Sequence, residues 1–106
     1  MKINKISSQN FGQIYFDSKD LEQKIRLKMA DLPNRDKNKL NELIFRNMHS
    51  DKYDIHVKEN GNVYIRNNQN GDKTEVLGMV SILDKFQAAL GYARINEIRD
   101  EYNKNA

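Results

Sequence analysis

The sequence of 106 residues contains no cysteine, no tryptophan and a single proline. The absence of cysteine excludes disulfides, thiolate-bound zinc, iron–sulfur clusters and thiol catalysis. No apolar run approaches the roughly 20 residues that a membrane-spanning helix needs, so we expect no membrane partner. The N-terminal residues lack the apolar segment of a secretory signal, which predicts a cytoplasmic protein without disulfides.

Catalytic and cofactor motifs are also lacking. The five glycines show neither Gly-x-Gly spacing nor a Gly-Lys-Ser/Thr run, which excludes P-loop and dinucleotide sites. His49, Asp51, Asp54 and His56 bring four possible metal ligands within eight residues, but their spacing matches no local metal-binding motif. No serine lies in a nucleophile-elbow motif. We therefore predict a chain that is not an enzyme, with no catalytic residues, no metal and no small-molecule cofactor.

What the chain does have is a small excess of positive charge, formally +3 at pH 7. The excess lies mainly between residues 24 and 46, where seven basic residues accompany three acidic ones. Such a stretch is either the solvated face of amphipathic helices or a surface that attracts phosphates or acidic proteins. Its candidate binding residues are Lys24, Lys28, Arg35, Lys37 and Lys39.

Two helices are predicted in the first half of the chain. Asp17 or Ser18 caps a helix that ends at or just after Leu32, because Pro33 disfavours its continuation. A second helix is predicted from about Asp36 to His49. Each has a stripe of apolar residues at helical spacing, and the short link between them predicts an α-helical hairpin. The stripes are Leu21, Ile25, Met29 and Leu32 in the first helix, and Leu40, Leu43, Ile44 and Met48 in the second.

The period of the apolar residues then changes from 3.6 to 2, which predicts strands near residues 53–57 and 63–66. A loop of three residues that ends in Gly61 pairs Val57 with Val63 and buries both apolar sets on one face. A loop of two residues would put them on opposite faces. We therefore predict a type I turn with a G1 bulge and a positive φ at Gly61.

Three further elements complete the predicted fold. A two-residue loop at Asn70 and Gly71 leads to a third strand over residues 73–80, in a register that pairs Arg66 with Glu75. A long helix runs from about Ile82 to Tyr102. Its predicted buried side is Ile82, Phe86, Ala89, Leu90 and Ala93, followed by Ile98 and Tyr102. Gly91 costs this helix about 1 kcal/mol relative to alanine, so we expect a packing reason for it.

The fold class is thus α+β, with a helical hairpin, a three-stranded antiparallel meander and a long C-terminal helix in one compact domain of residues 1–106. Residues 11–16 predict a further N-terminal strand because they are rich in strand formers. Residues 1–10 are expected to be loosely ordered or to form an edge strand. No internal repeat or linker divides the chain.

Two hypotheses of function remain. The first is a small non-catalytic module, of adaptor or inhibitor type, that binds another protein or itself through apolar residues outside the core stripes: Leu27, Phe45, Tyr92 and Ile95. The second is a nucleic-acid-binding domain that uses the basic helical stretch and one face of the first hairpin. In the predicted register His56 lies opposite Tyr64, and Lys58 and Arg66 share their face. A solvated sheet face is the alternative interpretation of these four residues.

Overall fold

A computed structural model describes residues 13–105 of the chain; the expectation for residues 1–10 lies outside this range. The elements in chain order are β1 (Ile14–Phe16), α2 (Lys19–Ala30), α3 (Asn34–Met48), β2 (Tyr53–Val57), β3 (Val63–Asn67), β4 (Lys73–Glu75) and α4 (Ile82–Asn105). The α+β class, the helical pair, the meander, the N-terminal strand and the long last helix are confirmed.

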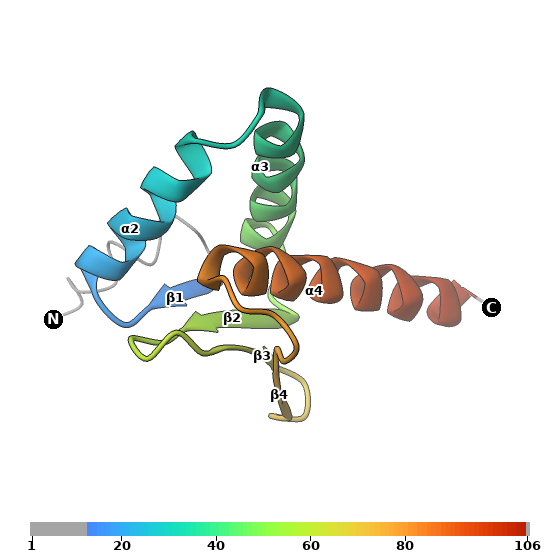
Figure 1. Cartoon of the computed structure of the whole chain (residues 1–106). Helices are drawn as coiled ribbons and strands as arrows, with labels where there is room; N and C mark the ends of the chain where they lie inside the picture. The colour runs from blue at the N-terminus through green and yellow to red at the C-terminus, as the bar shows by residue number, and fades with distance from the viewer. Residues whose placement is uncertain (1–12, 106) are drawn as a thin grey trace, which may run out of the picture.

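The four strands form one mixed sheet in the order β1-β2-β3-β4. β1 pairs in parallel with β2, and the other two pairings are antiparallel. Parallel neighbours need a crossover connection, which α2 and α3 supply. Figure 1 shows all three described helices on the same side of the sheet, with α4 lying across β2 and β3. The opposite face of the sheet carries no helix of the described chain.

Local signals explain the first two helices. The Oγ of Ser18 accepts a hydrogen bond of 3.1 Å from the backbone N–H of Leu21, as a helix N-cap does. Pro33 caps α3, so this helix begins two residues before the predicted Asp36. The two helices open from their link as a V, and each contacts α4 (Figure 1).

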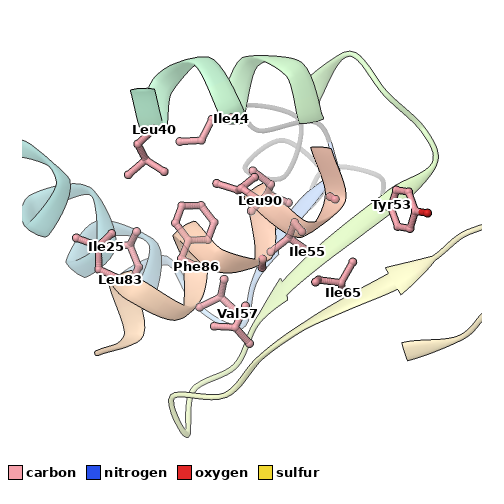
Figure 2. Packing of buried hydrophobic residues seen from close by; sticks show 14 of the residues in the cluster. Ile25, Leu40, Ile44, Tyr53, Ile55, Val57, Ile65, Leu83, Phe86 and Leu90 are labelled. Atoms are coloured by element: carbon pink, nitrogen blue, oxygen red, sulfur yellow. The ribbon is translucent and has the colours of Figure 1, made fainter. Parts of the chain in front are cut away.

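The core lies between α4 and the covered face of the sheet. Phe86 and Leu90 of α4 are fully buried against the sheet residues Ile55 and Val57 (Figure 2). Figure 2 also shows side chains of α2 and α3, among them Ile25, reaching the same core. Burial of each such side chain stabilises the fold by about 1.5–3 kcal/mol.

The first hairpin has the predicted register. Val57 pairs with Val63 and Ile55 with Ile65, so all four lie on the covered face and are buried. The loop contains a hydrogen bond of 3.0 Å from the Gly61 N–H to the Lys58 carbonyl, and φ of Gly61 is +91°. The pattern of apolar residues therefore selected the correct loop length.

The predicted register of the second hairpin is wrong by two residues. Arg66 pairs with Lys73 rather than with Glu75, and Glu75 lies opposite Tyr64. The loop has four residues because side chains cap it: Asn67 Oδ1 accepts from the Gln69 N–H, and Asn70 Oδ1 from the Asp72 N–H, both at 2.9 Å. The strand is also shorter than predicted and ends at Glu75.

The packing contact expected at Gly91 is not found within one copy of the described chain. A Cβ atom at this position would meet nothing within 4 Å inside the described chain. No close approach of another element therefore explains the glycine within one copy of the molecule.

Candidate functional site

The open sheet face is the first candidate surface, and it contains the four residues that the hairpin pattern singled out. We define it by the outward side chains of β1 to β4 and their ends: Tyr15, Asp17, Asp54, His56, Lys58, Tyr64, Arg66, Lys73 and Glu75. The strand register places Tyr15 beside His56 and His56 beside Tyr64. The predicted juxtaposition of His56 with Tyr64 is therefore confirmed, and β1 adds a third ring.

The three rings form a stack across three strands. The ring centroids of Tyr15 and His56 are 5.0 Å apart, and those of His56 and Tyr64 are 4.8 Å apart, with nearly parallel planes. The Lys73 Nζ lies 5.3 Å from the centroid of the Tyr64 ring. Both flat faces of the His56 ring are thus already covered by the two tyrosine rings.

The surroundings of His56 favour the neutral form of its ring. Burial lowers the pKa of His56 below its ordinary 6.5, and Lys58, Lys73 and Arg66 lower the pKa further, while Asp54 opposes them. Among the described residues, the buried Nε2 atom of His56 has no hydrogen-bond partner. At this position a neutral imidazole with one unpaired nitrogen costs less free energy than a partly buried imidazolium close to the three cations Lys58, Lys73 and Arg66 would cost.

The cations of the open sheet face are matched by acids. Lys58 forms an ion pair of 3.2 Å with Asp17. The pKa of Asp17 is lowered, first by the hydrogen bond that its carboxylate accepts from the Glu59 N–H and then by Lys58. The face thus holds three basic side chains, Lys58, Arg66 and Lys73. It also holds three acidic side chains, Asp17, Asp54 and Glu75.

Arg66 also belongs to a local network. Its Nη1 donates a hydrogen bond of 2.6 Å to Asn68 Oδ1, and the Asn68 amide donates to Asp54 Oδ1 at 2.9 Å. The guanidinium is therefore already engaged in holding the second loop against β2. With no net formal charge, the open sheet face lacks the positive potential on which phosphate binding depends.

The basic helical stretch is distributed over two diverging helices. Lys24 and Lys28 lie on α2, and Arg35, Lys37 and Lys39 lie on α3; all are exposed except the half-buried Lys37. Two other basic residues of the stretch, Arg26 and Arg46, form ion pairs with Glu22 and Glu42 on their own helices. These contacts are typical of solvated helix faces.

A second candidate surface is the outward side of α4. The last buried residue of this helix in the described chain is Ala93, yet the helix continues for 12 more residues. Four large side chains along it are 46%, 58%, 49% and 75% exposed: Tyr92, Ile95, Ile98 and Tyr102. The prediction that Ile98 and Tyr102 continue the buried side is therefore wrong.

The reason is one of length. A helix of 24 residues is about 36 Å long, whereas a strand of five residues spans about 17 Å, so the sheet cannot cover the whole of α4. Figure 1 shows the C-terminal end of α4 projecting beyond the sheet. Its last contact with the sheet includes a hydrogen bond of 3.3 Å from the Tyr53 hydroxyl to Asp100.

Three of these exposed residues, Ile95, Ile98 and Tyr102, belong to one regular pattern that begins at the half-buried Ala88 and Gly91. Ala88, Gly91, Ile95, Ile98 and Tyr102 follow one another at intervals of three, four, three and four residues. We call these five residues the outer α4 stripe. Of these five residues only Ile95 is among the contact residues predicted from the sequence. The signal that could have revealed the whole stripe is this second 3-4 spacing beside the buried one of Phe86, Leu90 and Ala93.

Within residues 13–105, no group of three or more His, Asp or Glu side chains is placed to hold a metal ion. No helix in this range combines the length and the hydropathy that crossing a bilayer requires. Comparison with known proteins found no matching family model, no similar curated protein and no similar solved structure.

Proposed function

We propose that this chain is a small non-catalytic protein-binding module whose contact surface is the outer α4 stripe. One observation carries the proposal: α4 remains helical for 12 residues after its last buried residue, and the large residues of its outward side there are Ile95, Ile98 and Tyr102. Helical segments of this length are marginal in water without packing. A partner that covers the stripe would supply the missing packing.

The composition of the surface supports a protein partner over a nucleic acid. Aromatic and aliphatic side chains form the centre of protein interfaces, with charged residues at the rim. The outer α4 stripe has this arrangement, since Arg94, Arg99 and Glu101 flank Ile95, Ile98 and Tyr102. The nucleic-acid alternative has less support, because the cations of the open sheet face are balanced by acids and Lys58 is paired with Asp17.

Site-specific photo-crosslinking tests the proposal. A photo-reactive amino acid replaces Ile98 in the full chain, and in a control it replaces Leu27, which is 63% exposed on α2. Each chain is irradiated when pure and again in a lysate of the source cells. We expect covalent adducts with a second copy or one discrete protein from position 98, and several-fold fewer from position 27. Equal labelling at the two positions in both settings would overturn the proposal.

A further inference from the structure

Resting on the proposed function, we propose that the partner of the outer α4 stripe is a second copy of this chain, with the two α4 helices packed antiparallel. In this register Ile95 of each copy lies opposite Ile98 of the other, and Gly91 lies opposite Tyr102. The two-fold axis passes between residues 96 and 97 of both helices. The contact is isologous, as in most homodimers.

The spacing of the stripe is that of a two-helix seam. Intervals of three and four residues keep side chains on the line of contact between two packed helices. The stripe lies opposite the core-facing side of α4, because Phe86, Leu90 and Ala93 are displaced from it by about half a turn. The fold therefore presents this side of the helix outward, with no described element over Ile95, Ile98 or Tyr102.

The flanking charges favour the antiparallel arrangement. Arg94 and Glu101 lie on the same side of the stripe, since both line the hollow between α4 and the end of α3. Antiparallel helices in this register place Arg94 beside Glu101 of the second copy, and the symmetry makes the pair twice. Neither residue forms an ion pair inside the described chain.

A parallel arrangement would set these charges against each other. In a parallel pair of helices, a residue that flanks the seam lies beside the flanking residue five positions further along the partner. This arrangement brings Arg94 beside Arg99 of the second copy. In the antiparallel register Arg99 instead lies beside Tyr92 on the other flank, where a guanidinium can stack on the ring. Charge complementarity thus selects both the partner and its direction.

Gly91 gains an explanation in the same register. The space above it is open in one copy, since a Cβ atom would meet nothing within 4 Å. The opposing residue is Tyr102, which is 75% exposed and the largest side chain of the stripe. A large ring set against a glycine lets the two helix backbones approach closely at both ends of the contact.

Charge reversal tests this inference. Arg94→Glu and Glu101→Arg are made singly and together, and their self-association is followed by sedimentation velocity over a range of protein concentrations. Each single change creates two repulsive pairs, so we expect a dissociation constant about tenfold higher, and the double variant should return close to the wild type. Arg35→Glu is the matched control, because it changes the charge of an exposed residue on α3. Thermal unfolding of every variant confirms that the fold is retained.

The outcomes separate this inference from the proposed function. A wild-type chain that stays monomeric, or a double variant that is not rescued, overturns the antiparallel homodimer. If position 98 still crosslinks to another protein in that case, the protein-binding function stands and its partner is a different chain. If position 98 crosslinks to nothing, both proposals fail.

Discussion

Glycine has opposite roles at two positions of this chain. Gly61 has a φ of +91°, a backbone conformation that costs an L-residue about 1–2 kcal/mol. Gly91 lies within α4, where glycine is about 1 kcal/mol less favourable than alanine, and no described atom crowds the site of a Cβ. The same substitution should therefore have opposite effects on stability.

We predict that Gly61→Ala lowers the free energy of unfolding by about 1 kcal/mol, because of the left-handed backbone, and that Gly91→Ala raises it by up to about 1 kcal/mol. Urea unfolding at low protein concentration measures both variants with the chain monomeric. A destabilising Gly91→Ala would mean that the outward side of α4 is crowded within one copy, contrary to the structure.

At the scale of elements, the two hairpins show what periodicity can and cannot predict. The first register was predictable because, of the two short loops compared, only the three-residue loop places Ile55, Val57, Val63 and Ile65 on the same face. The second was not, because β4 is exposed and a shift of two residues leaves every side chain on its face. Side-chain caps from Asn67 and Asn70 then fix the loop, and no apolar pattern encodes them.

For the candidate surfaces, too, periodicity predicted the contacts within the hairpin but not those that depend on the three-dimensional arrangement. Alternation along β2 and β3 sufficed to place His56 opposite Tyr64. The third ring, Tyr15, could not be foreseen, because pairing of β1 with β2 is a contact between residues about 40 apart in sequence. The exposure of Ile98 and Tyr102 depends on where α4 leaves the sheet, which is a matter of relative lengths in three dimensions rather than of periodicity.

The ring stack makes a prediction for the sheet as an element. Burial lowers the pKa of His56 in the folded chain. As the pH falls below about 6.5, His56 therefore takes up a proton in the unfolded chain before it does so in the folded chain. The free energy of unfolding is therefore highest above that pH and falls as the pH drops toward the folded-state pKa.

Urea unfolding at pH of about 7.5 and 5.5 should show this loss in the wild type. The loss should be smaller in His56→Phe, which keeps an aromatic ring in the stack but cannot take up a proton. An NMR titration of His56 provides the independent check, with a midpoint below 6.5 expected. Identical pH dependence of the two proteins would show that burial of His56 does not control it.

At the scale of the whole molecule, α4 has two apolar sides with different roles. One side builds the core through Phe86, Leu90 and Ala93. The other side, the outer α4 stripe, lies on the surface and continues past the end of the sheet. In the proposed homodimer, one side of α4 packs on its own sheet and the other side packs on α4 of the second copy. This arrangement would account for the length of α4, for Gly91 and for the flanking charges together.

Disulfide trapping measures this pairing most directly, because the chain has no cysteine of its own and each variant carries a single thiol. Gly91→Cys and Tyr102→Cys proteins are oxidised separately and as an equimolar mixture, and the products are identified by mass. The antiparallel homodimer predicts a disulfide between the two different variants as the main product of the mixture, with little dimer from either alone. Dimers of Tyr102→Cys with itself, or no crosslink in the mixture, would contradict the account.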